Sequence, residues 1–226
     1  MIPLKDDNPA ERFPLVTIAL VAANLAAFWW QVTGPGLEAS VLRGGAIPYE
    51  ILRFEDIEYR DIVPPPLTIF TSMFLHGGVA HVGFNMLTLW IFGNNVEDAL
   101  GRLRFAVFYL LSGVAAAVTQ TLAAAFSGDV LTPMVGASGA IAGVLAAYLM
   151  LFPRHRILTF IVPIWFLRIP AGFFIVFWFA GQVLNAVFGG EPGVAVFAHI
   201  GGFVAGWIML RLMGRRPTWR ARRVGW

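Results

Sequence analysis

The sequence predicts an all-α fold, a polytopic membrane bundle of six transmembrane helices in a single domain. Three observations support this prediction. Of the 226 residues, 58% are hydrophobic and only 13% are charged, whereas about 25% charged residues is usual in soluble domains. The mean hydropathy is +0.73, and apolar stretches close to the roughly 20 residues needed to cross a bilayer recur along the chain.

The first span is expected at residues 13–32, after a charged cytoplasmic segment at residues 1–12. A cleavable signal peptide is the alternative interpretation. We favour a membrane anchor, because the stretch is long, ends in two tryptophans and is followed by no small-residue cleavage pattern. Residues 33–78 then form a long acidic loop, part of which should lie in the membrane interface.

Five further spans follow in the second two thirds of the chain. We expect them at residues 80–96, 105–126, 134–151, 171–188 and 194–210. Residues 157–167, which Pro163 interrupts, are predicted to be a short connection. Residues 13–210 thus form one membrane domain, and residues 211–226 form a basic cytoplasmic tail. The tail has the composition of a lipid-headgroup ligand, although we favour a plain topology signal.

The distribution of cations tests the number of spans. With a cytoplasmic N-terminus, six spans place 13 of the 16 Lys and Arg residues inside. These are Lys5, Arg12, Arg102, Arg104, Arg154, Arg156, Arg168, Arg211, Arg215, Arg216, Arg220, Arg222 and Arg223. Arg43, Arg53 and Arg60 remain in the outer loop. The positive-inside rule favours this topology, with both termini cytoplasmic. We expect a multi-pass protein of a prokaryotic cytoplasmic membrane, with the lipid bilayer and no nucleic acid as partner.

Four polar residues within the predicted spans are candidates for function. His81 and Asn85 lie four residues apart and share a helix face, Ser138 opens the fourth span, and His199 lies near the start of the sixth. Counted from the cytoplasmic end of each span, Ser138, His199 and His81 all lie roughly 17 to 23 Å deep. Polar groups in a membrane normally face the protein interior or a watery cavity. We therefore expect one pocket, open to the outer side.

The residue types in this pocket indicate nucleophilic catalysis. A serine hydroxyl needs a neighbouring base, and neutral imidazole is suited to that role, so Ser138 is the candidate nucleophile and His199 the candidate base. The backbone donors at Ser138, the Asn85 amide and His81 are candidates for an oxyanion hole. No carboxylate is expected at this depth, which favours a Ser-His dyad over a triad.

Four glycines are predicted to allow close helix packing. Gly136 and Gly139 flank the serine, and Gly202 and Gly206 form a GxxxG motif just after His199. Small residues let helices approach closely in lipid. Such an approach is needed if a serine and a histidine on separate helices are to come within about 3 Å of each other.

Three segments together resemble the rhomboid intramembrane serine proteases. They are HGGVAHVGFNM at 76–86, GASGA at 136–140 and HIGGFVAG at 199–206. The resemblance covers nearly the whole chain and implies a rhomboid-like fold. It also implies that Ser138 is the nucleophile and His199 the base, with His81 and Asn85 in the oxyanion hole. The implied activity is cleavage of single-pass membrane proteins in or near their transmembrane segment, gated by the fifth span or an outer loop.

The sequence departs from the family pattern at two places. Many members carry a Trp-Arg pair in the first loop, where this chain has Pro66, Leu67 and Thr68. Several members also place an aromatic residue four positions after the serine, stacked on the histidine, where this chain has Ala142. We therefore expect His199 to be positioned by another aromatic residue or to be less firmly fixed.

Other functions remain as alternatives. A catalytically weak rhomboid-like protein that binds membrane clients would share the fold, but the presence of both Ser138 and His199 favours a protease. A transporter should carry acidic residues or broken helices near the midplane. A metal site formed by His76, His81 and His199 would lack cysteine or carboxylate ligands. We expect neither a metal nor a cofactor.

Overall fold

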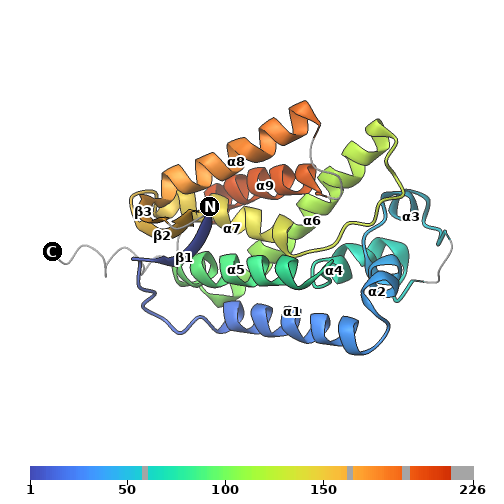
Figure 1. Ribbon diagram of the computed structural model, residues 1–226, viewed down its shortest axis with the longest axis horizontal. Helices are drawn as coiled ribbons and strands as arrows, with labels where there is room; N and C mark the ends of the chain where they lie inside the picture. The colour runs from blue at the N-terminus through green and yellow to red at the C-terminus, as the bar shows by residue number, and fades with distance from the viewer. Residues whose placement is uncertain (58–60, 162–164, 190–193, 215–226) are drawn as a thin grey trace.

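The computed structural model describes residues 1–57, 61–161, 165–189 and 194–214, and the long helices in these ranges confirm the predicted membrane bundle. Successive long helices run in alternating directions (Figure 1). Their bounds are α1 (Leu15–Thr33), α5 (Val79–Leu100), α6 (Arg102–Ser127), α7 (Ser138–Leu151), α8 (Ala171–Phe188) and α9 (Val196–Met213). Of these, α1, α6, α8 and α9 are long and apolar enough to cross a membrane on their own.

Short helices fill the loop between α1 and α5. They are α2 (Leu37–Gly44), α3 (Pro48–Arg53), the 3₁₀ helix η1 (Pro65–Leu67) and α4 (Thr68–Ser72). This loop and its helices lie at one end of the bundle (Figure 1). The loop that the sequence placed outside the membrane is therefore folded against the bundle.

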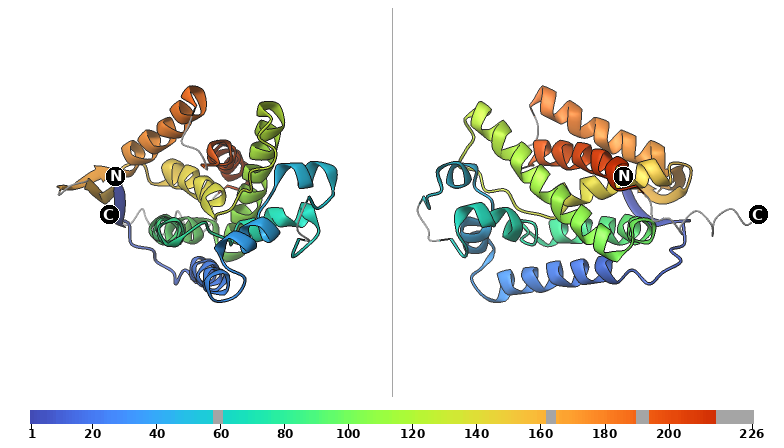
Figure 2. Two further views of the ribbon diagram at one scale, coloured as in Figure 1. Left: turned by 45° about the vertical axis from the view of Figure 1, so that its right-hand side comes forward. Right: turned by 180° about the vertical axis from the view of Figure 1, so that it is seen from behind.

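Helix α7 lies in the centre of the bundle, between α5, α6 and α9 (Figure 2). Every residue from Gly139 to Tyr148 is buried. With 14 residues at about 1.5 Å each, the helix is shorter than the hydrocarbon core, which is about 30 Å thick. The first residue of α7, Ser138, therefore lies inside the layer that the longer helices cross.

The start of α7 differs from the prediction, which placed the fourth span at residues 134–151. The helix begins only at Ser138. Before it, Met134 pairs with Ala46 in an isolated bridge, and the Gly136 amide donates to the Ser72 carbonyl at 2.8 Å. Gly136 has φ +120°, a conformation that side chains disfavour. These contacts hold Met134 and Gly136 outside the helix, which the αR residue Ala137 then leads into.

A three-stranded sheet, which the sequence analysis did not predict, covers the other end of the bundle. Its strands are β1 (Ile2–Asp6), β2 (Arg156–Ile161) and β3 (Trp165–Pro170), paired antiparallel in that order. The predicted short connection at 157–167 is thus a β-hairpin, and Pro163 lies outside the described residues. The N-terminal segment supplies β1, which pairs with one edge of this hairpin, so the segment belongs to the fold.

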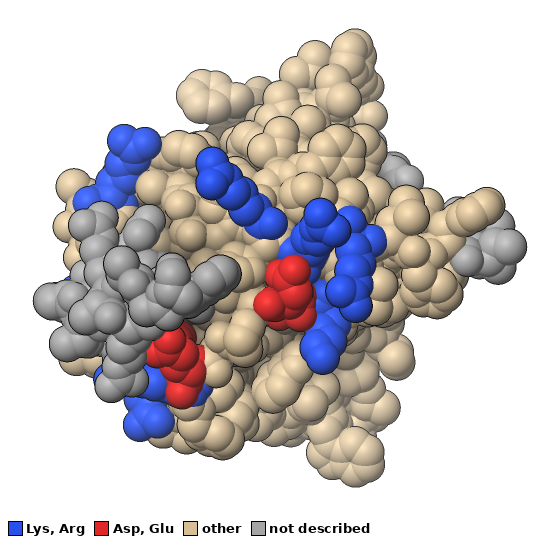
Figure 3. Space-filling model, turned by 90° about the vertical axis from the view of Figure 1, so that its left-hand side faces the viewer, with Lys and Arg blue, Asp and Glu red and all other residues tan. Residues whose placement is uncertain are grey.

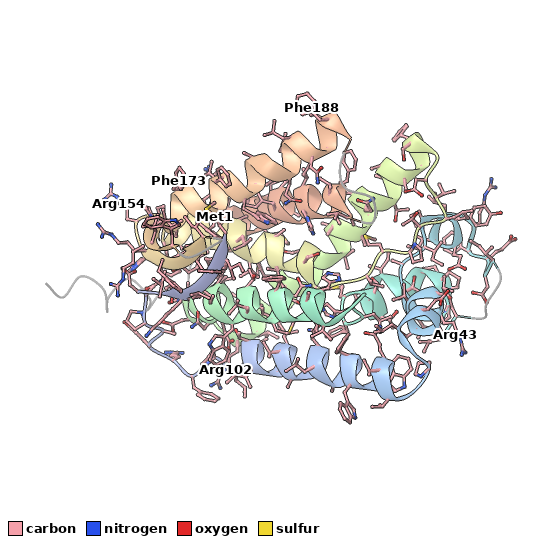
Figure 4. The ribbon with its side chains drawn as sticks, viewed as in Figure 1. Met1, Arg43, Arg102, Arg154, Phe173 and Phe188 are labelled. Carbon is pink, nitrogen blue, oxygen red and sulfur yellow. The ribbon has the colours of Figure 1, made fainter. Side chains whose placement is uncertain are left out.

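Lys and Arg side chains gather at this sheet end of the molecule (Figure 3). Arg102 and Arg154 lie there with Met1, whereas Arg43 lies at the opposite end (Figure 4). Arg60 and the tail residues 215–226 lie outside the described residues. The three labelled arginines are thus divided between the two ends of the bundle, and the orientation in the membrane stays a prediction.

Two carboxylates of the N-terminal segment tie it to the bundle. Asp6 accepts hydrogen bonds from the Tyr148 hydroxyl at 2.7 Å and from the Asn95 amide at 2.9 Å. Asp7 accepts one from the Arg156 amide at 2.9 Å and lies 3.0 Å from a ring nitrogen of His155. Because β3 leads directly into α8, this network also anchors the base of α8.

Helix α1 docks through polar residues. Its fully buried residues, spaced seven apart, are Thr17, Asn24 and Gln31. The Thr17 amide and hydroxyl both donate to the buried Glu97 carboxylate at 2.8 Å. Gln31 exchanges hydrogen bonds with the backbone of His76, accepting from its amide at 2.9 Å and donating to its carbonyl at 3.2 Å. Glu97, at the end of α5, thus satisfies amides that the start of α1 leaves free.

Candidate active site

Ser138 and His199 meet across the contact between α7 and α9. The Ser138 hydroxyl oxygen lies 2.8 Å from His199 Nε2, a hydrogen-bond distance for a hydroxyl and an imidazole. Ser138 is the first residue of α7, and His199 lies in the first turn of α9. Nucleophile and base within this distance are the geometric signature of an activated serine.

The glycines expected to pack helices make this approach possible. A Cβ atom at Gly202 would overlap the carbonyl oxygen of Gly139, and one at Gly206 would lie 2.5 Å from the Cα of Gly143. A Cβ at Gly139 would in turn lie 2.5 Å from the Cβ of Ala116 on α6. The backbones of α7 and α9 are therefore in direct contact.

The predicted pocket is present. A cavity of about 490 Å³ is lined by all four candidate residues, Ser138, His199, His81 and Asn85. The common depth inferred from the sequence thus corresponds to a common cavity. Exposed Asp129 also lines it and accepts a hydrogen bond from the Thr132 hydroxyl at 2.6 Å.

Asn85 presents a free donor to this cavity. Its side chain is 6% exposed, and its Nδ2 atom has no hydrogen-bond partner among the described residues. Leaving a buried amide donor unpaired costs about 1–3 kcal/mol, so the donor is available to a ligand that supplies an acceptor.

His81 approaches the segment that precedes the serine. A Cβ at Gly136 would lie 2.7 Å from His81 Nε2. The other ring nitrogen of His81 accepts a hydrogen bond from the Gly77 amide at 3.4 Å. Glycine at position 136 is thus required both by its positive φ and by the imidazole beside it.

The start of α7 adds backbone donors to the same place. No side chain within the described ranges caps this helix, and the first amides of a helix have no acceptor within it. The helix dipole also favours negative charge at this point. Together with Asn85, these groups can stabilise an oxyanion that forms next to Ser138.

Two residues near His199 were missed in the sequence analysis, and both come from α8. The Gln182 side-chain oxygen lies 2.7 Å from His199 Nδ1. The ring of Trp178 lies 5.8 Å from the imidazole, measured between centroids, at an angle of 45°. A polar residue inside the span predicted at 171–188 was the signal for Gln182, by the same rule that singled out His81.

The two departures from the family pattern have structural outcomes. Ala142 is completely buried, and Trp178 provides the other aromatic residue expected near His199. Thr68 is buried and donates to the carbonyl of Pro65, closing the turn of η1. His76 packs edge-on against His81 at 5.0 Å but does not line the cavity. No group of three potential metal ligands occurs in the described part of the chain.

Fold and site define an integral membrane protein in which a serine and a histidine meet at a cavity between helices. A family model described as the Rhomboid domain matches residues 65–216, about two thirds of the chain. The chain belongs to the rhomboid family.

The similar proteins carry rhomboid names. Rhomboid protein 1, mitochondrial, of Saccharomyces cerevisiae is 32% identical over 155 residues, which is 65% of this chain and 42% of the yeast protein. Rhomboid protease GluP of Bacillus subtilis is 31% identical over 147 residues, 65% of this chain and 26% of that protein. The presenilin-associated rhomboid-like protein, mitochondrial, of Bos taurus is 27% identical over 212 residues, which is 90% of this chain and 49% of the bovine protein. The chain spans less than half the length of these relatives.

Proposed function

We propose that the protein is an intramembrane serine endopeptidase that cleaves single-pass membrane proteins in or near their transmembrane segment. The observation that carries this proposal is the 2.8 Å contact between Ser138 and His199 at a cavity within the bundle. Membership of a family in which one relative is named a protease supports it.

The reaction begins when His199 Nε2 takes the proton of Ser138 as the serine oxygen attacks the substrate carbonyl carbon. The resulting oxyanion is stabilised by the amides at the start of α7 and by Asn85, with His81 beside them. His199 then gives its proton to the leaving amine, and the peptide bond breaks. A water molecule, deprotonated by the same histidine, hydrolyses the acyl-enzyme and restores Ser138.

The proposal includes an orientation in the membrane. Residues 13–210 form the membrane domain, and both flanking segments, 1–12 and 211–226, face the cytoplasm, because the cations of the outer loop are few. The partners are the lipid bilayer and single-pass substrates, with no nucleic acid. The relatives include mitochondrial and bacterial proteins, so they give no preference for the prokaryotic membrane expected from the sequence.

The direct test is cleavage by purified protein in liposomes. A library of single-pass segments is incubated with the parent protein and with Ser138→Ala, and the cut sites are mapped. We expect cleavage by the parent alone, together with labelling of Ser138 by a fluorophosphonate. Client binding without cleavage or labelling would instead support the client-binding alternative.

A further inference from the structure

We propose that Gln182 is a positioning residue for His199. In this role the Gln182 side-chain oxygen accepts a hydrogen bond from His199 Nδ1 and holds the imidazole in the tautomer that can act as base. The inference rests on the proposed function, because it concerns the same site.

The geometry is a chain of three side chains. Ser138 Oγ lies 2.8 Å from His199 Nε2, and His199 Nδ1 lies 2.7 Å from Gln182 Oε1. A neutral imidazole carries one N–H and one lone pair. An oxygen acceptor at Nδ1 keeps the proton there, which leaves the lone pair on Nε2 to take the serine proton. The opposite tautomer would present an N–H to the serine and could not act as its base.

An amide is suited to this position in a membrane. The third group of a serine triad is commonly a carboxylate, which orients the histidine and stabilises imidazolium. A charged side chain inside a bilayer is costly, and Gln182 provides the acceptor oxygen without a charge. The site then has the three hydrogen-bonded side chains of a triad, but its third member is uncharged.

Helix α8 holds the ring through a second contact on the same face. Trp178 lies four residues before Gln182, one helical turn away, and its ring contacts the imidazole at 5.8 Å between centroids. The two residues together supply the orientation that an aromatic residue at position 142 would otherwise give. Because Trp178 and Gln182 share one face of α8, the helix turns this face, and with it the half-buried Gln182 side chain, towards His199.

The test compares three variants of the protein in liposomes. Gln182→Met keeps the length of the side chain and removes the acceptor, and Gln182→Glu keeps an acceptor and adds a charge. Asn185→Leu is the control, because it changes another amide of α8, one that is not the partner of His199 Nδ1. The cleavage parameters kcat and KM are measured across pH for each variant and for the parent.

We expect Gln182→Met to lower kcat roughly tenfold with little change in KM, the size of effect that one net hydrogen bond allows. Gln182→Glu should retain most of the activity, and its loss of activity on the acid side should move to higher pH, because a carboxylate stabilises imidazolium. The other titratable groups lining the cavity, His81 and Asp129, are unchanged in every variant. Asn185→Leu should match the parent.

Parental kcat and pH profile in Gln182→Met would overturn the inference, as would equal losses in Gln182→Met and Asn185→Leu. If Gln182→Met does not fold, an unshifted pH profile of Gln182→Glu would overturn it. The tautomer is also read without turnover, from the side-chain ¹⁵N resonances of His199 in the parent. A proton on Nε2 would contradict the assignment to Gln182. Absence of cleavage and of Ser138 labelling in the parent, with the proton on Nδ1, would instead overturn the proposed function.

Discussion

His199 belongs to α9 and is contacted by α8, and these two helices differ in how tightly they pack against the bundle. Helix α9 carries the imidazole and lies against the backbone of α7, because Gly202 and Gly206 have no side chains that would separate the two helices. Helix α8 carries Gln182 and has its buried residues, Ala171, Phe174 and Ile175, in its first five positions.

Beyond these positions α8 is largely exposed. Phe188, at the end of the helix, points away from the bundle (Figure 4), with an exposed fraction of 79%. Its contact with α9 includes one close ring pair, Phe179 on Phe203, at 4.1 Å between centroids. The difference indicates that the distance from serine to histidine is set by a rigid pair of helices. The orientation of the imidazole depends on a helix that buries few residues beyond its first turns.

The largest effect is expected at the rigid pair. Ser138→Ala should abolish cleavage, a loss on the order of 10⁶-fold in kcat by analogy with a serine protease, while the fold stays nearly intact because one hydroxyl is removed. His199→Ala should be comparably inactive, and the double variant no worse than either, because members of one catalytic unit act together. Kinetics in liposomes measure this. Multiplicative losses in the double variant would show that His199 acts elsewhere.

Asn85→Ala tests a donor on α5, beside the rigid pair. Removing one oxyanion donor lowers kcat by about 10² to 10³-fold in other serine hydrolases, and we expect the low end, because backbone amides share the load. Stability should change little, since Nδ2 has no partner to lose in the described part of the chain and membrane hydrogen bonds average about 0.6 kcal/mol. Thermal melting and kcat of the reconstituted variant decide. Full kcat with a lower melting temperature would make Asn85 a packing residue.

A pair of glycine substitutions compares the two helices directly. Gly202→Ala places a methyl group against the Gly139 carbonyl and should destabilise the fold by about 1–3 kcal/mol, as overpacking does, with a loss of activity. Gly181→Ala on α8 is the matched control, because its Cβ would meet no atom of the described residues within 4 Å. Melting temperatures of both variants measure the contrast. Equal destabilisation would show that α8 is packed as tightly as α9.

The smallest effect is expected at the sheet that anchors α8. Burial opposes ionisation of Asp7, but hydrogen bonds from the Arg156 amide and from His155 outweigh it and lower the pKa of this carboxyl below its usual 3.8. A lowered pKa stabilises the fold above the unfolded value, and this stability is lost as the pH falls through the folded pKa.

Asp7→Asn should therefore lower the melting temperature slightly at neutral pH. The melting temperature of the variant should also fall less than that of the parent below about pH 4. Cleavage should be unchanged, because the sheet lies at the far end from the site. Melting curves between pH 3 and 7 test this. A parental pH dependence in the variant would show that the Asp7 network does not support the sheet.

The candidate site residues could be predicted because polar residues are rare, and so easily recognised, within the apolar spans of a membrane protein. Ser138, His199, His81 and Asn85 stand out against apolar spans, and helical rise alone placed three of them at one depth. Their meeting within one cavity follows from the glycines, which the sequence also shows. Gln182 was open to the same argument, but nothing in the sequence indicates which face of α8 turns towards His199.

The sheet and the start of α7 depend on contacts between distant segments. Strand β1 forms because residues 2–6 pair with residues 157–160, a pairing with no local signal. Residues 134–137 are apolar enough to extend the helix, and they stay out of it because Met134 and Gly136 bond to Ala46 and Ser72. Long-range pairing of this kind is not encoded by the hydrophobic pattern of a single stretch.

The polar docking face of α1 has a consequence for assembly. With 19 residues and a mean hydropathy of 1.7, α1 is able to enter a bilayer as an independent helix before any tertiary contact exists, the first of two stages in membrane protein folding. Association then depends on Thr17 and Gln31 finding Glu97 and the His76 backbone. A change of register by one residue displaces the docking side chains by about 100° around the helix axis and breaks these bonds together. Helix α1 therefore recognises the remaining helices in one register, and a separately synthesised α1 segment is expected to find the same place.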